Sequence, residues 1–173
     1  MLRLLTIAAL CTGSLLAHPH EEPSVEESKA VRESLAAAKK LVLYEGLPHP
    51  AKEAALFKTE ASDKASITLA DFHFYRKPLK TSPEITTQLK QALASPANLS
   101  EWKEKRCGGF HPDWSVSWRS GFRKKNHILI CFGCQQVIYL THDSQLRYDL
   151  KSKPFKELKE LLTPLHRNRP KAR

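Results

Sequence analysis

Residues 114–150 read WSVSWRSGFRKKNHILICFGCQQVIYLTHDSQLRYDL and contain four strand patterns separated by short turn signals. The first, WSVSW at 114–118, alternates large apolar residues with serines, which is the period of a β-strand with one buried face. Three further patterns follow at close spacing: HILICF at 127–132, QVIYLT at 136–141 and LRYDL at 146–150. This spacing predicts an antiparallel meander of about four strands in the C-terminal half of the chain.

Helical periodicity lies on both sides of this meander. Residues 82–94, SPEITTQLKQALA, begin with Ser82 as a candidate N-cap and Pro83 in the first turn, and carry apolar residues at helical spacing. The same spacing predicts helices over 25–40 and 153–162. We therefore expect an α+β protein with an antiparallel sheet and with helices packed on one face of that sheet.

Shorter elements are expected between residues 41 and 76. LVLYEG at 41–46 is typical of a buried strand, and AKEAALFKTE at 51–60 is typical of a short helix. SITLADFHFYR at 66–76 alternates apolar and polar residues, but the alternation shifts by one position in the middle. This segment is therefore interpreted as one bent strand or two short ones.

The N-terminus has the pattern of a secretion signal. Residues 1–17 carry one positive charge at Arg3, then an apolar run, and end at a small residue, Ala17. We expect cleavage near Ala17 and a periplasmic or secreted location. The apolar run is short for a permanent membrane helix and no later stretch is longer, so no membrane span is expected after processing.

The processed chain is expected to form one domain. Residues 18–25 lack periodicity and are interpreted as a flexible lead-in, and residues 166–173 form a basic tail. The single α+β domain is therefore assigned to residues 26–165. A processed chain of about 150 residues is long enough to bury a hydrophobic core without disulfides or metals.

The positive charge of the chain bears on its partners. The formal net charge is +10, and removal of residues 1–17 takes away Arg3 and no acidic residue, which leaves +9. This charge is compatible with an anionic surface as partner, or serves only solubility and loose surface attraction. Nucleic acid is not favoured because no recognition helix or paired aromatic platform accompanies the basic runs. Trp114 and Trp118 share one strand face and would stack on sugars or bases if exposed, although such a pair is more typical of a core. A polyanion- or sugar-binding module is therefore one alternative function.

Cysteine and histidine side chains gather in two short motifs. Cys107 and His111 lie in CGGFHPD, and Cys131 and Cys134 lie in CFGC, where one predicted strand ends and the next begins. Because the strand after CGGFHPD can pair with the strand that leads into CFGC, we expect the four side chains to form one local site. No catalytic residue is assigned, and we favour a non-enzymatic protein.

Three interpretations of this site remain open. The first is a structural disulfide among Cys107, Cys131 and Cys134, which an oxidising compartment favours. The second is zinc, which accepts three thiolates and one imidazole, although Gln135 stands where zinc knuckles carry glycine. No cofactor other than zinc is assigned. The third is a thiol oxidoreductase that uses CFGC, although the flanking residues predict strands and not the helix N-terminus that activates such thiols.

Four motifs resemble those of a family of small exported bacterial proteins with no known activity. The motifs are LYEGLPH at 43–49, CGGFHPDW at 107–114, ICFGC at 130–134 and HRNRP at 166–170. The resemblance implies secretion and a shared feature built from the loop and CFGC. It implies no ligand, substrate or catalytic residue.

Overall fold

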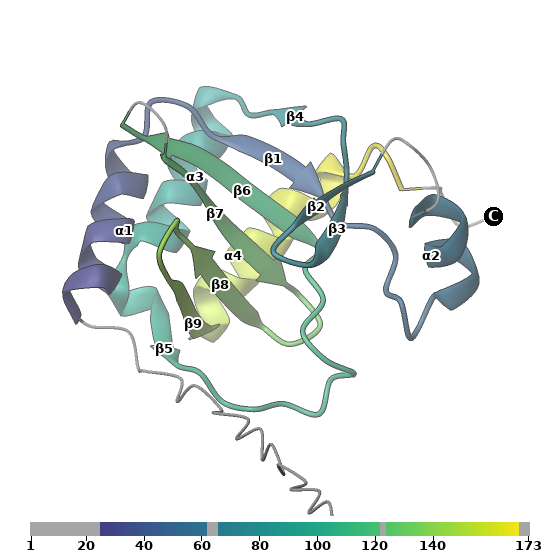
Figure 1. The fold of residues 1–173 in the computed structure, drawn as a ribbon. Helices are drawn as coiled ribbons and strands as arrows, with labels where there is room; N and C mark the ends of the chain where they lie inside the picture. The colour runs from purple at the N-terminus through teal and green to yellow at the C-terminus, as the bar shows by residue number, and fades with distance from the viewer. Residues whose placement is uncertain (1–24, 62–65, 122–123, 170–173) are drawn as a thin grey trace, which may run out of the picture.

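The structure is a computed structural model that describes residues 25–61, 66–121 and 124–169. The expected secretion signal and almost all of the expected lead-in lie outside the described residues. Within them, the chain forms four α-helices, a seven-stranded antiparallel sheet and a separate two-stranded sheet (Figure 1). The α+β class and the antiparallel sheet are thereby confirmed. None of the helices described has the length and hydrophobicity of a membrane span.

The predicted meander forms the centre of the large sheet. It consists of β6 (Trp114–Ser120), β7 (Lys124–Cys131), β8 (Gln136–Leu140) and β9 (Gln145–Leu150), and each strand pairs antiparallel with the next. All four predicted strands are therefore present and in the predicted order. The turn between β7 and β8 contains the CFGC motif.

Three more strands extend the sheet to seven, and the first of them is the strand predicted at 41–46. β1 (Val42–Glu45) pairs antiparallel with β6, β4 (Leu79–Lys80) pairs with the outer side of β1, and β5 (Leu99–Glu101) pairs with β9 at the other edge. In the register, Glu45 lies opposite Trp114. The loop that follows β1 therefore lies beside the CGGFHPD loop that precedes β6.

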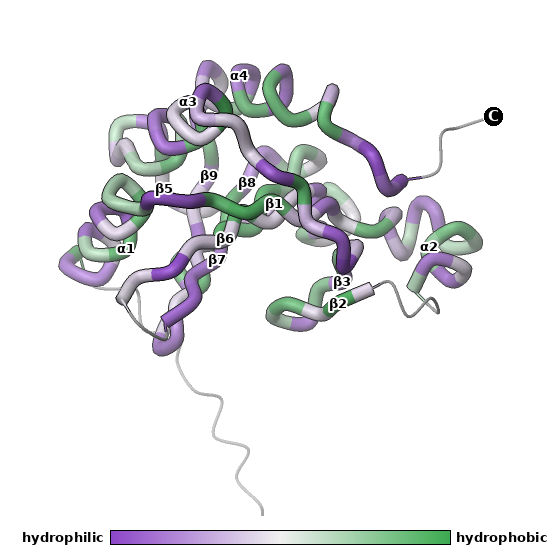
Figure 2. The backbone as a smooth tube through the Cα atoms, turned by 90° about the horizontal axis from the view of Figure 1, so that it is seen from above, coloured by the Kyte–Doolittle hydropathy of each residue, from purple (hydrophilic) through white to green (hydrophobic). Residues whose placement is uncertain are grey.

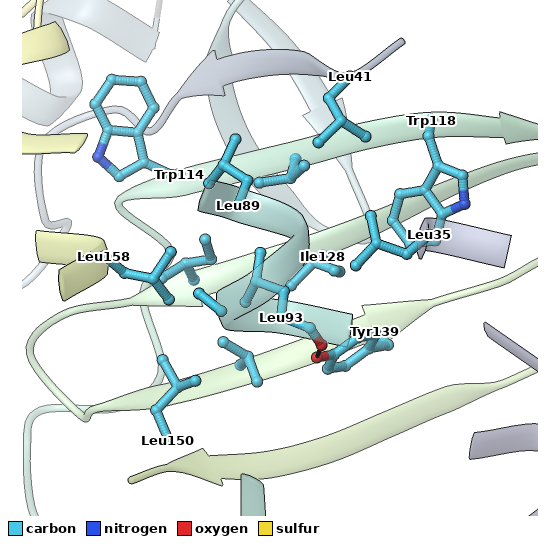
Figure 3. Close-up of a cluster of buried hydrophobic side chains, with 14 of the residues drawn as sticks. Leu35, Leu41, Leu89, Leu93, Trp114, Trp118, Ile128, Tyr139, Leu150 and Leu158 are labelled. Carbon is cyan, nitrogen blue, oxygen red and sulfur yellow. Dashed lines mark hydrogen bonds between the residues drawn. The ribbon is translucent and has the colours of Figure 1, made fainter. Parts of the chain in front are cut away.

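One face of the sheet packs against α1 (Val25–Ala37), α3 (Pro83–Ala94) and α4 (Ser152–Leu162) (Figure 3). The start of α3 is fixed by the predicted cap, because the Ser82 hydroxyl accepts a hydrogen bond from Ile85 N at 3.3 Å. The three helices and the sheet share one buried cluster. It includes Leu35, Leu89, Leu93, Trp114, Val116, Trp118, Ile128, Tyr139 and Leu158.

Both tryptophans of β6 belong to this core. The exposed fractions of Trp114 and Trp118 are 0% and 2%. The alternation of WSVSW thus places the tryptophans on the helix-covered face of the sheet. The expectation of an exposed stacking platform for sugars or bases at these residues is therefore wrong.

The segment at 66–76 forms a β-hairpin of its own. β2 (Ser66–Leu69) and β3 (Phe72–Tyr75) are joined by Ala70 and Asp71, whose φ angles of 46° and 68° are those of a tight two-residue hairpin turn. Phe74 of β3 packs in a second buried cluster with residues of β7 and β8. Figure 2 shows the hairpin on the side of the sheet away from α3 and α4.

α2 (Ala54–Ala61) stands apart from the other helices (Figure 1). It buries none of its residues and contributes none to either hydrophobic cluster. It follows the loop at 46–53, which leaves β1 and passes the CGGFHPD loop. The sequence expectation of helices on one face therefore does not describe α2.

Candidate binding cavity beside a disulfide

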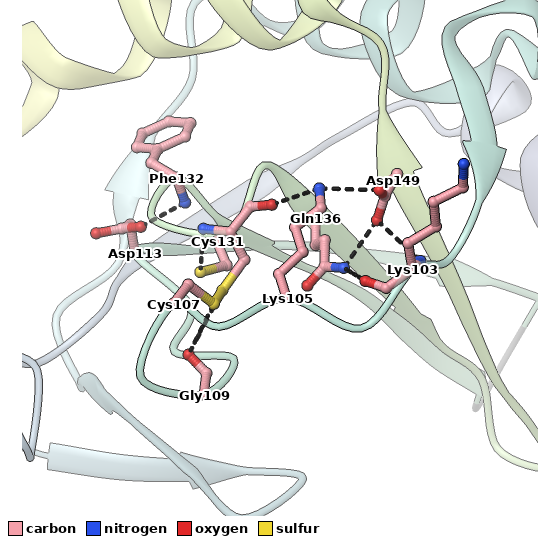
Figure 4. Close-up of a disulfide and its surroundings, with 10 residues drawn as sticks. Lys103, Lys105, Cys107, Gly109, Asp113, Cys131, Phe132, Gln136 and Asp149 are labelled. Carbon is pink, nitrogen blue, oxygen red and sulfur yellow. Dashed lines mark hydrogen bonds and ion pairs between the residues drawn. A yellow bond between two sulfur atoms is a disulfide. The ribbon is translucent and has the colours of Figure 1, made fainter.

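A disulfide joins Cys107 to Cys134, two cysteines 27 residues apart in sequence (Figure 4). It ties the loop before β6 to the turn between β7 and β8. Cys131 is free and buried. The disulfide interpretation therefore describes this pair, and two of the four expected zinc ligands are used by it. Among the described residues, no group of three or more His, Cys, Asp or Glu side chains is arranged to hold a metal ion.

The CFGC turn wraps backbone N–H groups around the Cys131 sulfur. Cys134 N donates to Cys131 Sγ at 3.3 Å. Burial raises the pKa of the Cys131 thiol, and hydrogen bonds from the backbone N–H groups of His111 and Cys134 only partly oppose this. Gln135 adopts a φ of 57°, which lies in the left-handed region that glycine adopts most easily. The turn therefore has a left-handed backbone at this position although the residue is glutamine.

Polar contacts hold the same loop on the sheet. Lys105 Nζ donates to the carbonyl oxygen of Cys134 at 2.8 Å and forms an ion pair with Asp149 Oδ2 at 2.8 Å. Gln136 Nε2 donates to Asp149 Oδ1 at 2.7 Å (Figure 4). The loop at 102–113 is therefore anchored on both sides of the CFGC turn.

The LYEGLPH and CGGFHPD loops touch at Gly46. Gly46 N donates to Asp113 O at 2.8 Å, and a Cβ atom on Gly46 would lie 2.1 Å from Pro112 O. Only glycine allows this close approach of two backbones. Asp113 also fixes the CFGC turn, because Asp113 Oδ2 accepts a hydrogen bond from Phe132 N at 2.7 Å. The two loops and the turn thus form one connected unit.

His111 faces this unit as a neutral ring. Its Nε2 donates to Leu47 O at 2.8 Å, which leaves the proton on Nε2 and the lone pair on Nδ1. Burial lowers the pKa of His111, and the hydrogen bond to Leu47 only partly opposes this. Cys107 is not a free thiol beside His111, because its sulfur belongs to the disulfide.

His49 stacks near His111, with the ring centroids 4.8 Å apart. Its Nδ1 accepts hydrogen bonds from Ala51 N at 3.1 Å and from Lys52 N at 3.3 Å. A neutral ring whose Nδ1 accepts carries its proton on Nε2. The Nε2 of His49 is buried and has no hydrogen-bond partner, so it is a donor available to a ligand.

Glu45 anchors the C-terminal segment to the site. Its carboxylate is fully buried and accepts hydrogen bonds from His166 Nδ1 at 2.7 Å and from the backbone N–H groups of Arg167, Asn168 and Arg169. Burial alone would raise the pKa of Glu45, but these four hydrogen bonds lower it below its ordinary value. Residues 166–169, which the sequence analysis assigns to a basic tail, are therefore part of the folded structure.

The same contacts place Arg169 near His111. Arg169 Nη2 donates to Leu47 O at 2.8 Å, the carbonyl that also accepts from His111. The Nε of Arg169 is buried without a hydrogen-bond partner. Arg169 and His49 thus each present one unsatisfied N–H group.

Both unsatisfied N–H groups belong to residues that line one small cavity. Its volume is about 190 Å³. The disulfide and Cys131 form one part of its wall, and the two histidines and Arg169 form another. The full lining is His49, Lys52, Glu53, Cys107, Gly109, His111, Asp113, Cys131, Gly133, Cys134 and Arg169. Buried polar groups without partners are uncommon in folded proteins, so this cavity is the candidate functional site.

The structure brings together all four side chains of the predicted site. Cys107, His111, Cys131 and Cys134 all line the cavity. The sequence analysis did not assign His49, Glu45 or Arg169 to the site. Their only sequence signal is that LYEGLPH and HRNRP occur among the motifs of the suggested family. Comparisons with protein-family models, with curated proteins and with solved structures found no match, so no residue role comes from a relative.

Proposed function

We propose that this is an exported, non-enzymatic protein whose Cys107–Cys134 disulfide braces a cavity for a small ligand with hydrogen-bond acceptors. The observation that carries the proposal is the pair of buried, unpartnered donors in one cavity, His49 Nε2 and Arg169 Nε. A ligand oxygen that accepts from both would satisfy them at no cost to other contacts. The small volume limits the ligand to a few non-hydrogen atoms.

The unused hydrogen-bond donors around the cavity favour an acceptor that carries negative charge. Lys52 and Arg169 supply two cations, and the carboxylates of Glu53 and Asp113 already accept hydrogen bonds from backbone N–H groups. The two positive side chains are thus the charged groups with donors to spare. Charge-assisted hydrogen bonds are about twice as strong as neutral ones. Small carboxylates and inorganic oxyanions fit this donor set.

A thermal-shift panel tests this proposal. The oxidised protein is heated with small carboxylates, inorganic oxyanions, neutral polyols and small amines, each at several concentrations. A ligand at 100 times its Kd stabilises the folded state by about 2.7 kcal/mol, which raises Tm by roughly 5 to 10 °C. We expect carboxylates or oxyanions to give such a saturable rise.

The matched variants are His49→Ala in the cavity and His142→Ala on the surface, where the side chain of His142 is 74% exposed. The rise in Tm should disappear in the first variant and persist in the second. An absence of any saturable shift across all four ligand classes contradicts the binding function. A rise in Tm that persists in His49→Ala would show that the ligand binds at another site.

Thiol–disulfide exchange is a second candidate function, and the third cysteine of the site favours it. Because Cys134 N donates to Cys131 Sγ, this sulfur lies beside the disulfide. Attack of a Cys131 thiolate on Cys134 Sγ would form a Cys131–Cys134 disulfide and release Cys107 as the leaving thiolate. The raised pKa of Cys131 leaves little thiolate for that attack, which is why ligand binding stands as the first proposal.

A further inference from the structure

We propose that a groove at one end of the sheet, separate from the disulfide cavity, binds a small diphosphate ester with a ring or apolar portion. The groove lies between the C-terminal end of α1 and the paired ends of β6 and β7, which are neighbours in Figure 1. Its volume is about 690 Å³, and it shares no lining residue with the disulfide cavity. Cavities of roughly 300–1,000 Å³ are typical of small-molecule sites.

The charge of the groove has one sign. Its lining includes Lys39, Lys40, Arg119 and Lys125 and no aspartate or glutamate. The first two follow α1, and the other two belong to β6 and β7. The dipole of α1 accounts for cations at its own C-terminus, but not for the pair on the sheet. Cations from separate elements therefore line the same groove.

The pair on the sheet is unfavourable without an anion. Arg119 and Lys125 are direct cross-strand partners in the β6–β7 ladder. Like charges in that position repel and destabilise the pairing. The neighbouring Lys124 has an acidic partner, Asp143, at 3.5 Å, whereas neither Arg119 nor Lys125 is ion-paired in the described residues. A bound anion would relieve this repulsion.

The floor of the groove is apolar. The partly buried Val42 and Tyr44 line it, whereas Trp118 is only 2% exposed and its indole N–H donates to Ser34 Oγ at 3.0 Å. The ammonium group of Lys125 lies 5.2 Å from the centre of the Tyr44 ring, which also lines the groove. The side chains of Val42 and Tyr44 therefore offer hydrophobic contact to a ligand. Cations at the rim and an apolar floor together suit a ring that carries a diphosphate.

Isothermal titration with two probes tests this inference. Inorganic pyrophosphate reports on the cations alone, and ADP adds a ring for the floor. We expect both to bind, with ADP tighter than pyrophosphate. The double variant Lys39→Gln and Lys40→Gln should lower the affinity for both probes by roughly tenfold or more. Each lost contact between a cation and an anionic group weakens binding and makes it less dependent on salt concentration.

The control variant Lys153→Gln and Lys156→Gln removes the same charge from exposed positions on α4. It should leave both affinities unchanged, and so should His49→Ala, which alters only the disulfide cavity. Equal weakening in the α4 control, or no binding of either probe, overturns the proposal. Retention on a heparin column without binding of either small probe also overturns it, because it would show attraction by net charge only.

Discussion

Reduction of the Cys107–Cys134 disulfide is expected to lower the free energy of unfolding by about 3.5 kcal/mol in the chain-entropy model. The disulfide joins two cysteines that are 27 positions apart, so cutting it restores conformational freedom to the unfolded chain. Urea unfolding of the oxidised and the reduced protein measures the difference directly. The midpoint should fall in reductant.

Cys131→Ala provides the matched control for this measurement. It removes the buried thiol and keeps the disulfide, so the effect of reductant on the unfolding midpoint should remain as large as in the parent protein. Cys107→Ser should abolish the effect of reductant. Equal midpoints for the parent protein with and without reductant would show that the disulfide does not stabilise the fold.

Glu45→Gln is expected to lower the free energy of unfolding by about 3 kcal/mol. The substitution keeps the shape of the side chain but replaces one acceptor oxygen by an NH₂ donor. That donor would face N–H groups which now donate to the carboxylate, namely those of His166 and of the backbone at Arg167–Arg169. The loss of buried, charge-assisted hydrogen bonds is among the most destabilising effects that a single substitution can have.

The same residue gives the fold a defined pH dependence. Because the pKa of Glu45 is lower in the folded protein than in the unfolded chain, its stabilisation is complete above its ordinary value of 4.5 and is lost as the pH falls through the lower folded pKa. Urea unfolding between pH 7 and pH 3 should show this loss in the parent protein and not in Glu45→Gln. Glu157→Gln, at a half-exposed position on α4, should behave like the parent.

Glu45 also connects stability to the cavity. It holds the segment that ends at Arg169, and Arg169 supplies one of the two unpartnered donors. Loss of the carboxylate should therefore weaken the binding of any ligand in the disulfide cavity. Ligands of the separate groove lined by Lys39 and Lys125 should bind with unchanged affinity. The two proposed sites can thus be separated by one substitution.

Sequence patterns predicted the strands and helices that are long enough to show a hydrophobic period. The four strands of the meander have five to eight residues each, and every one follows an alternating or continuous apolar pattern. Ser82 caps α3 as its position before Pro83 indicates. β4 and β5 have two and three residues, too few to show a period of two, so pairing with their neighbours decides them.

The candidate site could be predicted only in part. The two cysteine motifs meet because β6 and β7 pair, which the sequence pattern indicated. Which cysteines bond depends on the geometry of the loop, and sequence leaves such pairings open. Glu45 meets its partners across more than 120 residues, and no local pattern records a contact of that kind. The contact of residues 166–169 with Glu45 could not be predicted for the same reason, since a basic composition does not indicate packing against a buried carboxylate.

Disulfide mapping of protein purified without reductant tests the central claim most directly. Thiols are alkylated under denaturing conditions, and the unreduced protein is then cleaved with chymotrypsin, which cuts after Phe132 and so separates Cys131 from Cys134. A cross-linked pair of peptides that contains Cys107 and Cys134, with the alkyl label on Cys131 alone, is the result that the structure predicts. A Cys131–Cys134 cross-link, or a label on all three cysteines, would contradict the braced cavity.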